Sequence, residues 1–313
     1  MPKIVVCGAT GQMGRLITRE LVRQIPSTNI TLATRTPEKL AVEAAAGFRV
    51  VQADYRDRAS LDAAFAGSDT LMLISSLNIL KRVSEHRNAI DAAEQAGMGH
   101  IVYTSVSGVH PMNRTPSSTD HYATEQMLQK ADIGFTALRN QAYSEFASEM
   151  AMVPLITGVW EHVGEGAYSP VARADIAACA AAILLAPDKH RNVSYEITGP
   201  ELLSFRELSH RFAKMYDRPI EYVPVTPEEM WAKFDEWGVP RIGDPAAPSP
   251  HCFGSNELVE NYIAWDQLFH AVVSRHVEFI TGRKPIPLDQ IMIEAKEGVL
   301  AALQQITGHG VTA

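Results

Sequence analysis

The sequence has few of the residues that mark several large classes of protein. Only three cysteines, Cys7, Cys179 and Cys252, occur among 313 residues, and they are far apart. An odd, widely spaced set is a poor basis for a disulfide framework and indicates a reducing compartment, so we expect a cytoplasmic protein. No apolar run approaches the ~18 residues that a membrane-spanning helix needs. We therefore expect no membrane association.

Positive charge is also scarce. Lys and Arg total 28 against 36 Asp and Glu, which gives a formal net charge of -8 at pH 7. Proteins that bind nucleic acid or anionic membranes usually carry the opposite sign. We therefore expect a small-molecule ligand and no nucleic acid partner. A monomer and a homodimer both remain open.

Motifs of hydrolases and metalloenzymes are missing. The sequence contains neither a G-x-S-x-G nucleophile turn nor a His-Glu-x-x-His pair. His251 and Cys252 are neighbours, but no further ligand follows them at the spacing of a metal site. We expect no metal and find no support for a hydrolase.

Short apolar segments alternate with longer helical patterns from Lys3 to about Leu138. Such segments are typical of parallel strands buried on both faces of a sheet. The alternation predicts βα units and an α/β fold with a doubly wound parallel sheet of Rossmann type. The predicted strands are residues 4–7, 30–33, 48–52, 70–74, 100–104 and 135–138.

The alternation fails after Leu138, which predicts two domains. An alanine-rich helix at 175–185 and a strand at 194–197 are expected to return to the main sheet. We therefore predict a Rossmann domain from residues 1–140 and about 171–200. A smaller, mostly helical, substrate-binding lobe is expected from about 141–170 and 201–313. Within it, the proline-rich segment 238–255 is predicted to be either a binding loop or a surface excursion.

The clearest motif is Gly8-Ala9-Thr10-Gly11-Gln12-Met13-Gly14, which follows the first predicted strand and opens an amphipathic helix. Gly8 permits a tight turn, Gly11 lets the backbone approach a phosphate, and Gly14 lets helix and strand pack closely. A helix N-terminus in this setting holds a dinucleotide pyrophosphate. The alternative is a tight glycine turn with no ligand.

In a Rossmann-type fold, the residue at the end of the second strand determines the preference for NAD or NADP. An acidic residue there, about 20 residues beyond the glycines, binds the ribose 2′-hydroxyl of NAD. This chain has Thr34 and Arg35 instead. Because a guanidinium pairs well with a phosphate, the sequence predicts NADP(H); the alternative is a solvated surface arginine.

Polar side chains also follow the next three predicted strands. Asp54 either meets the adenine side of the cofactor or caps a helix within Asp54-Tyr55-Arg56-Asp57. Ser75 and Ser76 end the fourth strand and Ser105 ends the fifth. Ligands of open parallel sheets bind beyond the carboxyl ends of strands, so we expect these hydroxyls near the cofactor. Turn and capping roles are the alternative.

Five features together resemble the NmrA-like group of atypical short-chain dehydrogenases. They are the glycine motif at 8–14, Arg35, His121-Tyr122-Ala123-Thr124-Glu125, Leu138-Arg139-Asn140 and Tyr143. The pattern is most similar to bacterial NADPH-dependent quinone reductases and triphenylmethane dye reductases. It extends from the N-terminus through residue 175 and is weak across 238–255.

The sequence departs from ordinary short-chain dehydrogenases at their catalytic pair. Those enzymes use Tyr-x-x-x-Lys, in which the lysine lowers the tyrosine pKa for proton transfer to a carbonyl. Here Tyr122 is followed four residues later by Gln126. The other alignment frame places His121 at the lysine position and Ser117 at the tyrosine position, so neither frame restores the pair. The reaction that the sequence still allows is hydride transfer from the cofactor to an electron-poor acceptor, which needs little proton donation from the protein.

The resemblance places Asn140 and Tyr143 near the nicotinamide. His121 is expected to supply a proton or to hold the nicotinamide ribose; the alternative is a polar residue near a helix N-terminus. Tyr143 alternatively packs in the core. The candidate catalytic residues are His121, Asn140 and Tyr143. The candidate cofactor-binding residues are Gly8, Thr10, Gly11, Gln12, Met13, Gly14, Arg35, Asp54, Ser75, Ser76, Ser105, His121 and Asn140.

Aromatic residues occur in the segments expected to cover the cleft: Trp160, His162, Tyr168, Trp231, Phe234 and Trp237. A planar aromatic substrate suits such walls, and the alternative is that most of them form the core of the smaller lobe. The candidate substrate-binding residues are Tyr143, Trp160, His162 and Trp237.

The resemblance therefore implies an NADPH-dependent reductase that transfers hydride to a quinone-like or conjugated aromatic compound. A non-catalytic NADP-binding redox sensor of the NmrA type is the alternative, because the Tyr-x-x-x-Lys pair is missing. An isomerase or epimerase with tightly held NADP is disfavoured, since it would keep an acid–base tyrosine.

Overall fold

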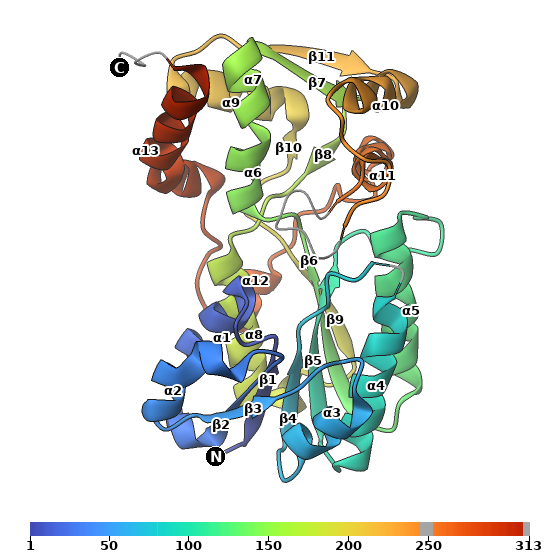
Figure 1. The fold of residues 1–313 in the computed structure, drawn as a ribbon, viewed down its shortest axis with the longest axis vertical. Coiled ribbons are helices and arrows are strands. Elements are labelled where there is room, and N and C mark those ends of the chain that lie inside the picture. Colours follow the sequence, from blue (N-terminus) through green and yellow to red (C-terminus); the bar gives the residue numbers. More distant parts are fainter. Residues whose placement is uncertain (80, 245–252, 309–313) are drawn as a thin grey trace. The chain divides into compact units, whose positions relative to one another are not determined.

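The computed structural model describes residues 1–79, 81–244 and 253–308 and divides into two compact units (Figure 1). Unit 1 comprises Met1–Asn140, Arg173–Ile197 and His276–Arg283. Unit 2 comprises Gln141–Ala172, Thr198–Arg275 and Lys284–Ala313. The segment His276–Arg283 is in unit 1, whereas the sequence assigned it to the smaller lobe. Its helix packs against two elements of unit 1, which no local sequence pattern reveals.

Unit 1 contains a seven-stranded parallel sheet with the order β3-β2-β1-β4-β5-β6-β9. Its strands are β1 (Ile4–Cys7), β2 (Ile30–Thr34), β3 (Arg49–Gln52), β4 (Thr70–Leu73), β5 (His100–Val106), β6 (Gly134–Asn140) and β9 (Val193–Ile197). The Rossmann-type α/β fold predicted from the sequence is confirmed. Ile4 of β1 pairs with Ile30 on one side and Thr70 on the other, so the strand order reverses there. Such a reversal is where ligands bind in open α/β sheets.

Two groups of helices flank this sheet (Figure 1). On one face α1 packs on α8 and α8 on α12; on the other α3 packs on α4 and α4 on α5. The helices of unit 1 are α1 (Gln12–Val22), α2 (Ala41–Ala45), α3 (Arg58–Phe65), α4 (Arg82–Gln95), α5 (Pro116–Lys130), α8 (Arg173–Leu185) and α12 (His276–Thr281), with short 3₁₀ helices η1 (Ser27–Asn29), η2 (Pro37–Leu40) and η3 (Pro187–His190).

The strands of unit 1 are apolar because both faces of the sheet are covered. Val5, Leu71 and Ile101 are fully buried in one hydrophobic cluster with side chains of α3, α4 and α5. Continuous apolar strands of this kind are what a parallel sheet between two helix layers requires. The candidate site lies at the carboxyl ends of these strands, where Thr34, Ser105 and Asn140 are found.

Unit 2 is mostly helical. Two small sheets join its strands: β7 pairs in parallel with β11, and β8 pairs antiparallel with β10. Its strands are β7 (Val159–Val163), β8 (Ala167–Tyr168), β10 (Leu203–Ser204) and β11 (Glu221–Val225). Its helices are α6 (Ser144–Met150), α7 (Met152–Thr157), α9 (Phe205–Tyr216), α10 (Pro227–Glu236), α11 (Ser255–Asp266) and α13 (Leu288–Thr307).

Local sequence signals fix several boundaries in unit 2. Ser204 with Glu207 and Thr226 with Glu229 form capping boxes that start α9 and α10. Residues 238–244 have no helix or strand, as the prolines of 238–255 predict. Pro245, Pro248 and Pro250 lie outside the described residues. In the described part of the chain, no helix is both long and apolar enough to cross a membrane.

Candidate active site

The glycine-rich turn joins β1 to α1 at the point where the strand order reverses. Gly8 has a φ of +67°, a conformation that side-chain-bearing residues rarely adopt. A Cβ on Gly14 would lie 2.8 Å from Cα of Ala9 and would also clash with the Gly8 carbonyl. Gly11 donates a hydrogen bond of 2.9 Å to that carbonyl. The turn and the first turn of the helix therefore pack more closely than other residues would allow.

The N-terminus of α1 is open to an anion. No side chain caps it, and its first turn contains no acidic residue. Gln12 is exposed, whereas Met13 and Gly14 are buried against the turn. Because unpaired N–H groups and the helix dipole favour negative charge, this end fits the pyrophosphate of a dinucleotide.

The end of β2 lies beside the glycine turn. The hydroxyls of Thr10 and Thr34 are 3.0 Å apart and form a hydrogen bond. Arg35 follows Thr34 and is exposed, with no ion pair to any described residue. Its charge is close enough to Asp54 to help lower the pKa of that carboxyl. The position and charge of Arg35 fit a 2′-phosphate.

Asp54 does not cap a helix; Asp57 caps α3 by accepting hydrogen bonds from the N–H groups of Ala59 and Ser60. The carboxylate of Asp54 accepts bonds of 3.0 and 2.6 Å from Nε and Nη2 of Arg56. Arg56 is therefore the main cause of the lowered Asp54 pKa. The negative charge of Asp54 is therefore paired with Arg56.

The serines at the strand ends are engaged inside the protein. The N–H of Ser75 donates to Oγ1 of Thr104 over 2.8 Å. Ser105 donates from its hydroxyl to Oε1 of Glu125 over 2.7 Å, and the same carboxylate pairs with Arg139. The described contacts give these groups a role in fixing the strand ends.

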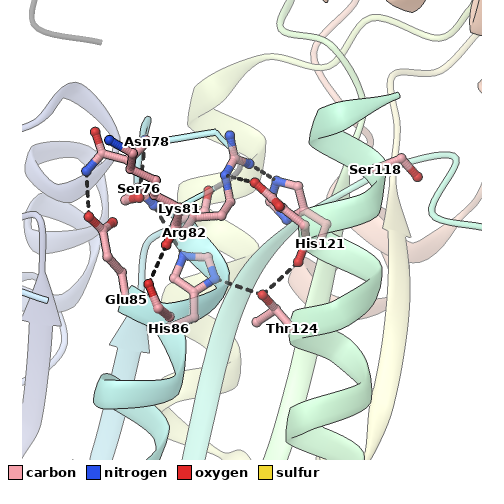
Figure 2. Close-up of polar contacts among 12 residues, drawn as sticks. Ser76, Asn78, Lys81, Arg82, Glu85, His86, Ser118, His121 and Thr124 are labelled. Atoms are coloured by element: carbon pink, nitrogen blue, oxygen red, sulfur yellow. Dashed lines mark hydrogen bonds and ion pairs between the residues drawn. The ribbon is translucent and has the colours of Figure 1, made fainter. Parts of the chain in front are cut away.

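His121 lies on α5, where both ring nitrogens have partners (Figure 2). Nη1 of Arg82 donates to Nε2 over 2.7 Å, and Nδ1 lies 2.6 Å from the hydroxyl of Tyr103. Because a guanidinium only donates, this network assigns the ring hydrogen to Nδ1. Burial and the Arg82 charge hold the pKa of His121 well below its usual value. The ring is therefore neutral and has no free N–H for a ligand.

Arg82 is a functional candidate that the sequence did not reveal. Its side chain is buried at the start of α4, and its Nε lies 3.4 Å from Oδ2 of Asp120 on α5. Together these side chains join two helices at the carboxyl ends of β4 and β5. An arginine at the start of a helix is usually solvated, and only the tertiary packing shows that this one is buried.

A second buried chain runs beside the first. The N–H of Ser76 donates to Nε2 of His86 over 3.3 Å, and Nδ1 of His86 lies 2.9 Å from Oγ1 of Thr124. The Thr124 hydroxyl donates to the Asp120 carbonyl over 2.9 Å, so it accepts a hydrogen from His86. Figure 2 shows this chain linking α4 to α5. Burial lowers the His86 pKa to about 3, so this ring is also neutral.

Asn140 ends β6 and is 4% exposed. Its Oδ1 is buried and has no hydrogen-bond partner among the described residues. A buried polar atom without a partner indicates a ligand or an ordered water. Among the candidate cofactor residues, Asn140 thus has a buried acceptor atom, Oδ1, that a ligand could pair with.

The remaining candidates belong to unit 2. Tyr143 is half-buried at the N-cap of α6 and stacks on Phe146. Trp160 is a buried core residue, which removes it from any wall open to a ligand in this structure. His162 is also buried, two residues farther along β7, so both project toward the same core. Trp237 is half-exposed beside Phe234.

No group of three or more His, Cys, Asp or Glu that could hold a metal occurs within residues 1–79, 81–244 and 253–308. The described cysteines, Cys7 and Cys179, are buried and unbridged, and burial raises the pKa of both thiols to about 12. Neither has the lowered pKa of a reactive thiol. His251 and Cys252 lie outside the described residues.

Comparisons with known proteins agree with this geometry. A family model described as NAD(P)H-binding matches residues 8–187. Quinone oxidoreductase 2 of Escherichia coli is 34% identical over 240 residues, which cover 76% of this chain and 82% of that protein. An NAD(P)H azoreductase of Xenophilus azovorans is 27% identical over 238 residues, covering 76% and 82%.

Solved structures lead to the same group. The NADPH complex of the Escherichia coli NADPH-dependent quinone oxidoreductase superposes with a TM-score of 0.84 at 29% identity, covering 93% of this chain and 99% of that one. The NADP(H) complex of Citrobacter triphenylmethane reductase has a TM-score of 0.80 at 27% identity, covering 94% and 99%. The chain therefore belongs to the NAD(P)H-binding, NmrA-like family of short-chain oxidoreductases and is an NAD(P)H-dependent reductase.

Proposed function

We propose that this protein is an NADPH-dependent reductase of a quinone-like or conjugated aromatic compound. Unit 1 holds the cofactor: the turn from Gly8 to Gly14 binds the pyrophosphate, and Arg35 binds the 2′-phosphate. Asn140 orients the nicotinamide through its buried Oδ1. When bound, the cofactor supplies the hydride. Unit 2 supplies substrate contacts, for which Tyr143 and Trp237 remain candidates from the sequence.

The polar network that keeps the His121 ring neutral is the observation that carries this proposal. Arg82, Tyr103 and the buried position leave His121 no hydrogen to give to a substrate. The network holds the ends of β4 and β5 in place and offers no acid that titrates near neutral pH. We therefore assign His121 a positioning role. An acceptor that takes hydride without acid help, such as a quinone or a cationic dye, suits such a site.

The relatives support the same substrate class. Quinone oxidoreductase 2, the azoreductase and the triphenylmethane reductase are named for electron-poor conjugated acceptors. None of these acceptors needs a tyrosine–lysine pair to accept hydride. The family resemblance and the network around His121 thus favour one kind of acceptor.

The test is NADPH oxidation by the purified chain with 1,4-naphthoquinone, a cationic triphenylmethane dye, a conjugated enone and a simple ketone. We expect turnover with the first two and none with the ketone. NADP(H) binding without turnover of any compound would instead support a redox sensor. Turnover of the ketone alone would contradict the acceptor class.

A further inference from the structure

Three neighbouring strands of unit 1 carry a row of polar side chains near their carboxyl ends. Ser105 of β5 lies opposite Arg139 of β6, and Arg139 lies opposite Glu196 of β9. Residues that lie opposite one another in a parallel sheet present their side chains to the same face. Glu125 of α5 joins this row, and its side chain is 1% exposed. We call these four residues and Ser107, which directly follows β5, the Arg139 network.

Arg139 connects two carboxylates within this network. Its Nε and Nη2 donate to Oε1 and Oε2 of Glu125 over 3.0 and 2.6 Å, so this pair is bidentate. Its Nη1 donates to Oε1 of Glu196 over 3.5 Å. The hydroxyl of Ser105 donates to Oε1 of Glu125 over 2.7 Å. Because the guanidinium is a planar fork, a bidentate pair fixes the direction of the side chain as well as its position.

The contacts form a closed circuit that includes Asn140. The N–H of Ser107 donates to the Asn140 carbonyl over 2.8 Å. The hydroxyl of Ser107 donates to Oε2 of Glu196 over 2.8 Å, and the other oxygen of that carboxylate accepts from Arg139. Arg139 precedes Asn140 in the chain and completes the circuit through the peptide bond. The backbone of Asn140 is therefore held both at its carbonyl and through the residue before it.

The place of Asn140 in the chain makes such a restraint useful. Asn140 is the last residue of β6, and the chain passes from unit 1 to unit 2 at Gln141. Strand ends open at a lower free energy than the centre of a sheet. Oδ1 of Asn140 is buried without a partner among the described residues, and a hydrogen bond weakens steeply when its geometry is poor. The Asn140 amide can therefore hold a ligand well only if the end of β6 is fixed.

Stability alone is a weak explanation for the Arg139 network. Glu125 is almost fully buried, so its desolvation opposes the attraction of the ion pair. Well-packed apolar residues of similar volume often stabilise a fold as much as a buried ion pair does. The bidentate pair and the circuit through Ser107 instead specify one orientation of the strand end, which apolar contacts would not.

We propose that Arg139 is a positioning residue, which fixes the end of β6 so that the Asn140 amide meets the nicotinamide of the bound cofactor. The inference rests on the proposed function, in which Asn140 orients the nicotinamide. Successive side chains leave a strand on opposite faces, so the effect of Arg139 on Asn140 passes through the backbone and the Ser107–Glu196 contact. Arg139 differs in this respect from Arg35, which binds the cofactor directly.

The experiment measures binding to the full chain by isothermal titration with two compounds. They are NADPH and adenosine 2′,5′-bisphosphate, which has the adenine and the 2′-phosphate but no nicotinamide. Asn140→Ala and Arg139→Met should each raise the Kd for NADPH about tenfold, as expected for the loss of one hydrogen bond, and should leave the Kd for the bisphosphate unchanged. The double variant should bind NADPH no more weakly than either single variant, because both changes remove the same interaction.

Two further variants guard against a fold that R139M disrupts. Arg139→Lys keeps the charge without the fork, so its Kd for NADPH should lie between those of wild type and R139M. Ser107→Ala removes one hydroxyl from the circuit and should raise the Kd for NADPH about threefold, again with no change for the bisphosphate. Thermal unfolding of each variant is measured alongside.

Arg211→Met is the matched control. Arg211 of α9 donates from Nη1 and Nη2 to Glu201 over 2.8 and 2.6 Å and also pairs with Asp289 at 3.2 Å. Its side chain is 29% exposed, against 27% for Arg139, so the two arginines have similar surroundings. Because Arg211 belongs to unit 2, R211M should change neither Kd.

The outcomes separate the inference from the proposed function. Equal weakening of NADPH and the bisphosphate by R139M and S107A would give Arg139 a purely structural role and overturn the inference. Losses that add in the double variant would do the same, as would a selective loss in N140A with none in R139M and S107A. Wild-type NADPH affinity in N140A would overturn the role of Asn140 in the proposed function. Selective losses in both variants without NADPH oxidation by any acceptor would support the positioning role and overturn the reductase.

Discussion

Nη1 of Arg82 donates a hydrogen bond of 2.7 Å to Nε2 of His121, and each residue is 4% exposed. The same guanidinium faces Asp120 at 3.4 Å. A cation therefore occupies the interior of unit 1 between the ends of two neighbouring strands. It lies beside the His121 ring, and burial together with the Arg82 charge lowers the pKa of that ring well below its usual value.

Removing that cation should destabilise the fold severely. Arg82→Met removes one half of the buried ion pair with Asp120 and the donor to His121, so the free energy of unfolding should fall by about 3–5 kcal/mol. Arg15→Met is the control, because Arg15 is half-exposed in its pair with Glu43 and should cost less than about 1 kcal/mol. Urea denaturation measures both. Equal small losses would show that the buried pair has no structural role.

The glycine turn predicts a second contrast. Gly14→Ala places a methyl group against Ala9 and the Gly8 carbonyl, so the turn must shift and NADPH binding should fall more than tenfold. Gly298→Ala, within α13, meets nothing within 4 Å and should stabilise the protein by up to about 1 kcal/mol. Isothermal titration with NADPH and thermal unfolding report the two effects. Unchanged affinity in G14A would contradict the role given to the turn.

Arg35 sets the third prediction. If it binds the 2′-phosphate, Arg35→Ala should raise the Kd for NADPH about 10- to 100-fold and leave the Kd for NADH nearly unchanged. Lys39→Ala removes a nearby exposed charge and should change neither value by more than about twofold. Titration of both variants with both cofactors decides the point. Equal weakening of NADPH and NADH by R35A would remove the assignment.

Buried histidines predict a loss of stability in acid. Burial lowers the pKa of His86 and His162 to about 3 and that of His100 and His270 to about 4. The unfolded chain protonates these rings near pH 6.5, so it binds more protons than the folded state at lower pH. The free energy of unfolding should therefore fall as the pH drops from about 6.5 to 4.

The slope of that loss is the quantity to measure, by urea denaturation at several pH values. Each such histidine contributes at most about 1.4 kcal/mol per pH unit. His162→Phe should reduce the slope by roughly one proton, whereas His210→Gln, at an exposed position, should not. A slope that is the same in wild type and H162F would mean that His162 is protonated in the folded state.

The strands and the cofactor turn could be predicted because their signals are local. Ile4–Cys7 is apolar through burial on both faces, and the glycines of 8–14 are required by contacts within that stretch. Arg35 could be placed for the same reason, because it directly follows a predictable strand. Most strands of the parallel sheet can thus be predicted from short segments of the sequence, without knowledge of contacts between distant residues.

The polar network around His121 and the buried core of unit 2 depend on contacts between distant segments. Arg82 and His121 are 39 residues apart, and nothing near either one shows that they meet. Trp160 was expected at a substrate wall, and only the packing shows that its side chain is buried in the core of unit 2. The substrate candidates were therefore the least predictable part of the site.

The pH dependence of hydride transfer tests the central claim most directly. Single-turnover oxidation of bound NADPH by 1,4-naphthoquinone should have the same rate from pH 6 to 9. Arg82, Asp120, Tyr103 and His86 surround His121, and the described contacts hold this ring neutral across that range. A rate that is constant supports a reductase without an acid–base residue. A rate that changes about tenfold per pH unit would show that a titrating group donates a proton and would contradict the account.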